Sequence, residues 1–266
     1  MVKFHTSAHS YDYSLSAVSL AYFLRYPNPY STHVLTEDVI DRYFDADSQK
    51  LYTTRLHLKK SKMPPWLMKM LPRNILGGCK GQNGEAQNFI LERSIVDIKA
   101  GWMETETQNL QLANVVKVIE TQRYDRSFTI EEEAKDSTTR REKTDVVTTV
   151  TLRSRFGEMI RKGERSDGQE RQGLLAWSTQ RLRRAIEEKT LEKTRIGLIN
   201  SKEGMGVVLG RLRQGGLSAV LEGMRQDRLL VLAGVPGRGA HLHESSPRWK
   251  SLWKNNNDSG EGGFDL

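Results

Sequence analysis

HVLTEDVIDRYFDADSQKLYTTRLHLKK, residues 33–60, contains two runs of strand length on either side of the polar turn DADSQ. Two such runs across a short polar turn predict a β-hairpin. Neither strand has a purely apolar face. In the second strand, for example, Arg55 and His57 lie on the same face. A solvated or edge position explains each polar residue taken singly. Together they favour a partly wet cavity that binds an amphipathic molecule.

The segments on both sides of this hairpin extend the pattern. SLSAVSLAYFLR, residues 14–25, has apolar residues at helical spacing behind serines that can cap a helix, which must end by Pro27. Downstream, runs of strand length with short Gly or Asn breaks predict an antiparallel meander. These runs span residues 88–98, 102–112, 114–124 and 144–156.

The C-terminal third of the chain changes to helical spacing. Apolar residues recur every three to five positions from Leu174 to about Arg213, and the pair Gly215-Gly216 predicts the end of this helix. A short helix over residues 217–232 follows. One helix, several antiparallel strands and a long terminal helix make an α+β pattern in which the sheet needs an element laid across its apolar face. A long helix resting in a curved sheet leaves a cavity between them.

The composition predicts one folded domain and several flexible parts. We expect the domain to span residues 1–225, with flexible inserts at about 77–87, 125–143 and 157–173, which are rich in glycine or charge. Residues 226–266 are expected to form a disordered tail, because glycine, proline, serine and asparagine dominate its later part.

The bulk numbers limit the partners and the chemistry. The 266 residues carry a formal net charge of +8, which favours an anionic partner such as nucleic acid, an acidic membrane or an acidic protein. Cys79 is the only cysteine, so the chain has no internal disulfide and no cysteine-based zinc site. No apolar run approaches the roughly 20 residues of a membrane span. The start, MVKFHTSAHSYDY, has no signal core or transit-peptide pattern, so the mature protein is expected to begin near Met1.

Enzyme signatures are missing from the sequence. It contains no HExxH, GxSxG, P-loop or GxGxxG motif, and the histidines show no metal-ligand spacing apart from a pair in the tail. We therefore expect no catalysis, no metal and no cofactor. GCKG, residues 78–81, superficially resembles the backbone-clamping loop of KH domains, so a basic RNA-binding protein remains an alternative of another class.

A short basic and apolar segment follows the hairpin. In KKSKMPPWLMKMLPRN, residues 59–74, cations precede apolar side chains, and prolines at 64, 65 and 72 prevent a long helix. Such a loop can cover a cavity mouth or dip into a bilayer interface while its cations meet lipid headgroups. A loop packed permanently on the core is the alternative.

Three motifs together resemble one known family. RYPNPYSTHVLTEDVIDR (25–42), TTRLHLKKSKMPPW (53–66) and SKEGMGVVLGRL (201–212) look like the PRELI-like proteins, phospholipid carriers of the mitochondrial intermembrane space. The resemblance implies a helix-grip (START-like) fold: a curved antiparallel sheet of seven strands wrapped against a long C-terminal helix, with a lipid cavity and a lid loop. It also implies a heterodimer with a small helical-hairpin protein carrying twin Cx9C motifs, and transient contact with anionic membrane surfaces.

The resemblance also implies a ligand. The first motif is similar to the branch that carries phosphatidic acid for cardiolipin synthesis, whereas TQNLQLANVVKVIET (107–121) is also similar to the phosphatidylserine branch. We therefore expect phosphatidic acid, with phosphatidylserine as the alternative and no nucleic acid. An enzyme of the wider helix-grip superfold is a further alternative, because a fold does not fix function.

Site residues follow from the same resemblance, position by position. The lipid headgroup is expected to contact cations on the cavity floor, at its entrance and on the terminal helix. These are Arg25 and His33, then Lys59 and Lys62, then Arg195 and Lys202. The lid comprises Met63, Pro64, Pro65, Trp66, Leu67, Met68, Met70 and Leu71. Two structural alternatives remain: Arg25 as a cation favoured by a helix dipole, and His33 as a partner of the turn backbone.

Overall fold

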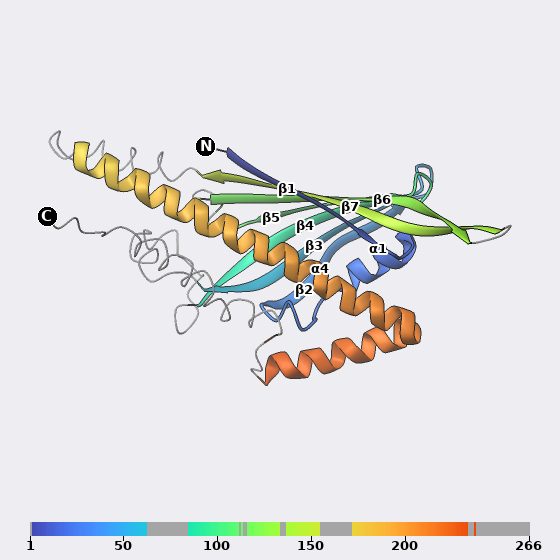
Figure 1. The fold of residues 1–266 in the computed structure, drawn as a ribbon. Helices are drawn as coiled ribbons and strands as arrows, with labels where there is room; N and C mark the ends of the chain where they lie inside the picture. The colour runs from blue at the N-terminus through green and yellow to red at the C-terminus, as the bar shows by residue number, and fades with distance from the viewer. Residues whose placement is uncertain are drawn as a thin grey trace, which may run out of the picture.

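A seven-stranded antiparallel sheet and one long helix form the architecture (Figure 1). The computed structural model describes residues 2–62, 85–111, 113, 116–133, 137–154, 172–233 and 237. The strands are β1 (Val2–Tyr11), β2 (Val34–Asp45), β3 (Lys50–Lys62), β4 (Glu85–Asp97), β5 (Trp102–Asn109), β6 (Val116–Glu133) and β7 (Ser137–Ser154). Their order is β1-β7-β6-β5-β4-β3-β2, with every neighbouring pair antiparallel.

The hairpin predicted at residues 33–60 is confirmed. Strands β2 and β3 pair in antiparallel register, from Asp45 opposite Lys50 to Val34 opposite Lys59, with two bulges on the way. Gln49 closes the turn with φ of 56°, in the left-handed region. From β2 to β7 the strands follow one another as a meander, whereas β1 crosses over to pair with β7 at the far edge.

Helix α1 (Leu15–Phe23) matches the helix predicted at 14–25. Ser14 is its N-cap, and the Ser14 hydroxyl accepts a hydrogen bond from the Ala17 backbone N–H at 3.3 Å. Val18 and Tyr22 are completely buried on the face toward the sheet. Arg25 lies beyond the C-cap residue, Leu24, so it is not in the last helical turn as expected.

Helix α4 (Gln172–Leu232) crosses the sheet and then folds back (Figure 1). Its helical geometry breaks at Gly215 and Gly216, and Gly216 has φ of 64°. Few residues other than glycine adopt that conformation readily, which explains why the predicted end of the long helix is confirmed here. The last part of α4 returns along the first, and the guanidinium of Arg211 donates a hydrogen bond to Asp227 Oδ2 at 2.7 Å.

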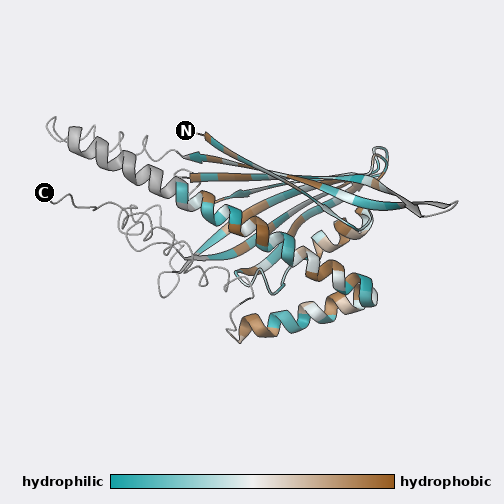
Figure 2. Cartoon of the chain, viewed as in Figure 1, coloured by the Kyte–Doolittle hydropathy of each residue, from teal (hydrophilic) through white to brown (hydrophobic). Residues whose placement is uncertain are grey.

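The main hydrophobic core lies between α1, the sheet and α4. Alternation of apolar and polar residues along the strands supplies one wall of this core (Figure 2). Its buried members are Tyr11, Leu15, Val18, Ala21, Tyr22, Val96, Met103, Tyr124, Val146, Met205, Val208, Leu209 and Val220. The predicted α+β helix-grip fold is therefore confirmed, because the long helix lies across the sheet and shares its core. Among the described residues, no helix has an apolar stretch long enough to cross a bilayer.

Two predictions about flexible segments need correction. Residues 125–143, expected from their charge to form a flexible insert, instead continue β6 and β7 as a paired hairpin, apart from 134–136, which lie outside the described residues. Cross-strand pairs such as Arg126 and Glu142, whose Nε and Oε1 atoms are 3.2 Å apart, favour this pairing although the composition is polar. Helix α4 extends to Leu232, so the start of the tail expected from residue 226 is helical.

The other flexible segments are not tested. Of the insert predicted at 157–173, only the last two positions are described, and they begin α4. Of the insert predicted at 77–87, only residues 85–87 are described, and they begin β4. Most of the tail lies outside them too.

Gly204 sets how closely α4 approaches the turn after α1. A Cβ atom at Gly204 would lie 2.8 Å from Asn28 Oδ1. The buried Asn28 side chain holds the turn, since its Nδ2 donates to the carbonyl of Arg25 at 2.6 Å and its Oδ1 accepts from the N–H of Tyr30 at 2.9 Å.

We expect Gly204→Ala to lower the free energy of unfolding by about 1–3 kcal/mol, because Asn28 must shift and weaken these hydrogen bonds. Gly206→Ala is the matched control: nothing lies within 4 Å of its Cβ position, so alanine should stabilise the helix by roughly 0.5–1 kcal/mol. Urea unfolding of the two variants measures the difference. Equal effects of the same sign would show that α4 does not press on the turn.

Candidate functional site

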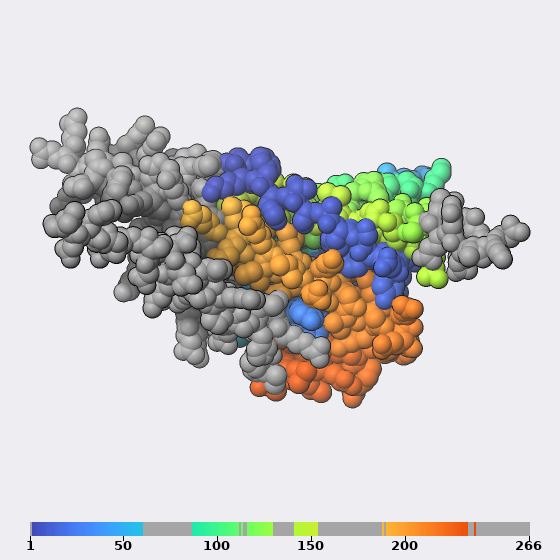
Figure 3. Space-filling model, in the orientation of Figure 1, coloured from blue at the N-terminus to red at the C-terminus, as the bar shows by residue number. Residues whose placement is uncertain are grey.

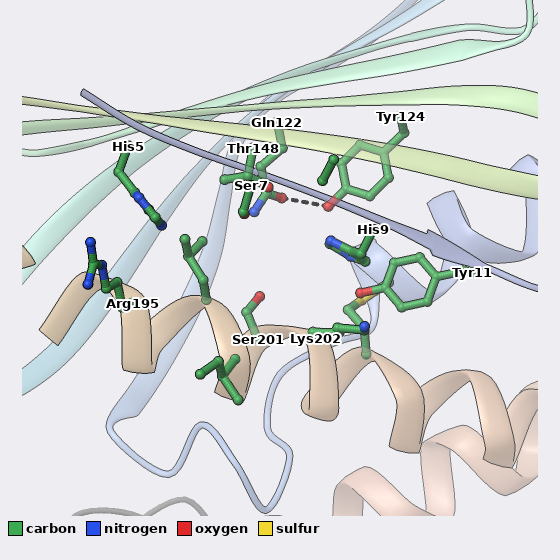
Figure 4. Close-up of a pocket in the computed structure, with 14 residues that line it drawn as sticks. His5, Ser7, His9, Tyr11, Gln122, Tyr124, Thr148, Arg195, Ser201 and Lys202 are labelled. Atoms are coloured by element: carbon green, nitrogen blue, oxygen red, sulfur yellow. Dashed lines mark hydrogen bonds between the residues drawn. The ribbon is translucent and has the colours of Figure 1, made fainter. Parts of the chain in front are cut away.

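A cavity of about 350 Å³ lies between the sheet and α4. Strands β1, β6 and β7 form one wall and the middle of α4 forms the other (Figure 4). The lining mixes apolar, hydroxyl, imidazole and cationic side chains: His5, Ser7, Ala8, His9, Tyr11, Gln122, Tyr124, Thr148, Arg195, Leu198, Ile199, Ser201, Lys202 and Met205. The mixed lining is that of a partly wet cavity, but none of the lining residues comes from the β2–β3 hairpin on which the prediction of such a cavity rested.

Two of the predicted cations belong to this cavity. Arg195 and Lys202 are seven residues apart on α4, which places both on the same helix face. Both side chains remain exposed at the cavity wall, and Figure 4 shows Arg195 across from His5. The structure therefore brings these two residues to one cavity, and their contact with a lipid headgroup stays a prediction.

A hydrogen-bonded row follows the inner face of β6. The hydroxyl of Tyr124 donates to Gln122 Oε1 at 2.5 Å, and Gln122 Nε2 donates to Glu120 Oε1 at 2.6 Å. Burial raises the pKa of Glu120, and the charges of Lys59 and Arg25 offset only part of this effect. The row orients the Gln122 amide and the Tyr124 hydroxyl at the cavity wall.

Arg25, one of the two residues predicted for the cavity floor, is not among the residues that line this cavity. It belongs to a buried ion cluster, in which its Nη2 donates to Glu92 Oε2 at 2.6 Å. Arg55 donates two hydrogen bonds to the other carboxylate oxygen, Glu92 Oε1. One comes from Nε at 2.8 Å and the other from Nη2. Glu92 is fully buried and bridges two cations from different segments.

Glu37 and His57 complete the cluster. Arg55 Nη1 donates to Glu37 Oε1 at 2.5 Å. His57 Nε2 lies 3.2 Å from Glu92 Oε2, and its Nδ1 lies 3.4 Å from Glu37 Oε2. Two arginines and two carboxylates balance in charge when the imidazole is neutral. A cluster of this kind costs little where it is complete, but losing one member leaves a buried charge without its partner.

Aromatic rings fix Arg25 from the side of α1. Its guanidinium carbon lies 3.7 Å from the centre of the Tyr22 ring and 4.8 Å from that of Tyr26. Lys59 Nζ lies 5.9 Å from the same Tyr26 ring. Arg25 and Lys59 therefore gather around one tyrosine, in a group separate from Arg195 and Lys202 in the described cavity.

The remaining predicted residues lie toward the end of β3. His33 precedes β2, is exposed, and accepts a backbone hydrogen bond from the N–H of Lys60 at 2.8 Å through its carbonyl. Lys62 is the last residue of β3 and pairs with Glu85 of β4. The lid predicted over Met63 to Leu71 lies outside the described residues.

Several groups at the site were missed by sequence reasoning. The polar face of β3, with Arg55 and His57, was recognised, but Glu92 was not paired with it. The available signal was register, because an antiparallel partner places Glu92 directly opposite Arg55. His5 and His9 were not considered as site residues, because their spacing is not that of metal ligands. In the structure both line the cavity. Among the described residues, no group of three or more His, Cys, Asp or Glu could hold a metal ion.

The cluster predicts how stability depends on pH. Burial lowers the pKa of His57 below its usual 6.5, and contact with Glu92 offsets this only in part. Burial by itself would raise the pKa of Glu92, but the charge of Arg25 and the hydrogen bond with His57 outweigh it and hold the pKa well below 4.5. For both groups the unfolded chain binds protons more readily than the folded protein, so acid favours unfolding.

We therefore expect the free energy of unfolding to fall as the pH drops below about 6.5, and to fall further below about 4.5. His57→Gln should make the first part of this curve shallower and leave the second, while His9 and His33, whose pKa values burial also lowers, keep the remainder of the first part. Urea unfolding at a series of pH values measures it. A His57→Gln curve that parallels the unaltered protein would show that His57 does not titrate between the two states.

Comparisons with known proteins point to one family. The model of the PRELI-like family matches residues 16–166. Protein ups1 homolog of Schizosaccharomyces pombe is 39% identical over 111 residues, which cover 42% of this chain and 57% of that protein. Protein UPS1, mitochondrial, of Saccharomyces cerevisiae is 38% identical over 120 residues, 45% of this chain and 62% of that protein.

A human relative gives a similar match. PRELI domain-containing protein 1, mitochondrial, of Homo sapiens is 38% identical over 120 residues, 45% of this chain and 50% of that protein. The chain thus spans between half and about three fifths of the length of these relatives.

Proposed function

Because the chain belongs to the PRELI-like family, whose model matches residues 16–166, we propose that it is a phospholipid carrier that moves phosphatidic acid between the two mitochondrial membranes and so supplies cardiolipin synthesis. The observation that carries this proposal is the cavity between sheet and helix with Arg195 and Lys202 on its wall. Relatives named as mitochondrial support the compartment, and we assign the carrier to the intermembrane space.

The mechanism needs no bond to break. A phospholipid that leaves a bilayer exposes acyl chains at about 0.8 kcal/mol per CH₂, so a carrier must offer apolar surface before the lipid is released. Leu198, Ile199 and Met205 offer such surface beside the two cations. A phosphate that loses its water shell needs charged donors, which Arg195 and Lys202 supply.

The other predicted cations have a different part in this mechanism. Arg25 is already paired with Glu92, so a phosphate that reaches it must share the guanidinium with that carboxylate. We assign Arg25 a supporting role: its ion pair with Glu92 and its contact with the Tyr26 ring hold in place the group that also contacts Lys59. His33, Lys59 and Lys62, together with the lid at 63–71, are proposed to form the entrance.

We further propose that the protein works as a heterodimer with a small twin Cx9C helical-hairpin partner, and that it contacts anionic membranes only transiently. A net charge of +8 favours such contact, at roughly 1 kcal/mol per cation near the surface.

A transfer assay tests the proposed function. The full-length protein, with its partner where needed for solubility, is mixed with donor liposomes that carry fluorescent phosphatidic acid and a quencher, and with unlabelled acceptor liposomes. We expect transfer of phosphatidic acid well above that of phosphatidylcholine. Faster transfer of phosphatidylserine would reassign the cargo, and the absence of any transfer would reject the carrier function.

A further inference from the structure

The last part of α4, residues 217–232, has one face fixed against the rest of the protein. Val220 is completely buried, and the buried Asp227 carboxylate accepts the hydrogen bond from Arg211. At Gly223 an added Cβ would lie 2.5 Å from the Arg211 guanidinium, so glycine lets that side chain pass. These contacts determine which side of the helix faces outward.

The outward side carries a stripe of leucines, which we call the leucine face. It comprises Leu217, Leu221, Leu229 and Leu232, with 48%, 50%, 59% and 75% of their surface exposed. At about 100° per residue they occupy an arc of roughly 120°. Figures 2 and 3 show this helix at the surface, its last turns apolar. Four large apolar side chains along one exposed helix mark a contact surface.

The same arc contains two cations. Arg225 and Arg228 fall between the leucines by the same helical spacing. Glu222 borders the arc, and its carboxylate lies 3.4 Å from Arg225 Nε, so the one nearby acid is paired. Exposed leucines and arginines together on one helix face favour a helix that lies in the interface of an anionic bilayer.

We propose that the leucine face docks the protein on anionic lipid surfaces, with residues 217–232 lying parallel to the membrane plane. The leucines enter the boundary between headgroups and acyl chains, and Arg225 and Arg228 contact the headgroup phosphates. The outward arc of this helix combines exposed leucines with two arginines, and Asp227 is buried on the other side against Arg211, so the arc suits an anionic plane. This inference rests on the membrane contact in the proposed function and deepens it, because it names the surface that makes that contact.

Vesicle flotation tests the docking surface. The full-length protein is mixed with phosphatidylcholine vesicles that contain phosphatidylglycerol, an anionic lipid that is not the proposed cargo. Leu221→Gln is compared with Leu230→Gln, its matched control on the same helix: Leu230 is 49% exposed but lies outside the leucine face. We expect Leu221→Gln to weaken vesicle binding about fivefold or more, with Leu230→Gln close to the unaltered protein.

A charge-reversal variant tests the docking surface independently. Arg228→Glu should weaken binding to these vesicles and reduce its dependence on salt, whereas Arg213→Glu, exposed but outside residues 217–232, should have a smaller effect. Circular dichroism checks that each variant keeps its helix content. Unchanged vesicle binding of Leu221→Gln, or equal losses for Leu221→Gln and Leu230→Gln, would overturn the proposal. Loss of a protein complex with unchanged vesicle binding would assign the face to a protein partner and also overturn it.

Discussion

Replacing Glu92 by alanine is expected to lower the free energy of unfolding by about 3–5 kcal/mol. The carboxylate is fully buried and holds Arg25 and Arg55 together. Its removal leaves two buried guanidinium groups with only Glu37 to balance them. A domain of this size has roughly 5–15 kcal/mol in total, so the variant should lose between about a fifth and all of its stability.

Urea unfolding at neutral pH measures this effect, and Glu104→Ala is the matched control. Glu104 contacts Arg123 at 3.4 Å on the surface, and its side chain is 48% exposed. Surface pairs of this kind contribute less than about 1 kcal/mol. A small loss for Glu92→Ala, equal to that of Glu104→Ala, would mean that water reaches the cluster and that its charges are not buried.

Reversing both cavity cations, with Arg195→Glu and Lys202→Glu together, is expected to slow phosphatidic acid transfer by about 10- to 100-fold. The lipid phosphate would then meet two carboxylates where it needs donors, and truncating such charge pairs typically costs 2–5 kcal/mol when they are buried. We expect a loss around or below the lower end of this range, about 1.4–2.7 kcal/mol, because both side chains are exposed. The same exposure should leave the thermal unfolding midpoint unchanged.

Arg213→Glu controls for the change in net charge. Arg213 is exposed on the same helix but does not line the cavity. Its reversal should lower transfer only slightly, through weaker attraction to the membrane. Equal losses in the two variants would show that overall charge, and not the cavity, limits transfer.

Much of the fold could be predicted because its signals are local. Ser14 caps α1, the DADSQ turn separates two alternating strands, and Gly215-Gly216 interrupts α4 where only glycine fits readily. Arg195 and Lys202 were assigned through the family resemblance, and their spacing of seven residues explains why they lie on one face of α4. Each of these features depends on residues that are close in sequence.

The parts that escaped prediction depend on distant contacts. Glu92 meets Arg25 and Arg55 across 67 and 37 positions, and only the strand register reveals that they are neighbours. The far part of the β6–β7 hairpin, within residues 125–143, was taken for a flexible insert, because its charges look solvated until the opposite strand supplies their partners. β1 was not predicted as a strand, and it forms the edge that contributes His5 and His9 to the cavity.

Arg25 illustrates the limit for the site. The resemblance assigned it to the lipid phosphate, and the structure pairs it with Glu92. Arg25→Glu would place two carboxylates together in the core, so lost transfer in that variant would not separate ligand binding from folding. The exposed cations on α4 give the cleaner test.

Native mass spectrometry of the full-length protein, purified without detergent, tests the central claim most directly. A carrier with a cavity between its sheet and α4 should retain one phospholipid molecule, seen as a single mass increment that collisional activation releases. Arg195→Glu with Lys202→Glu should lose that increment, and Arg213→Glu should keep it. A protein that carries no lipid and binds RNA in its place would contradict the account.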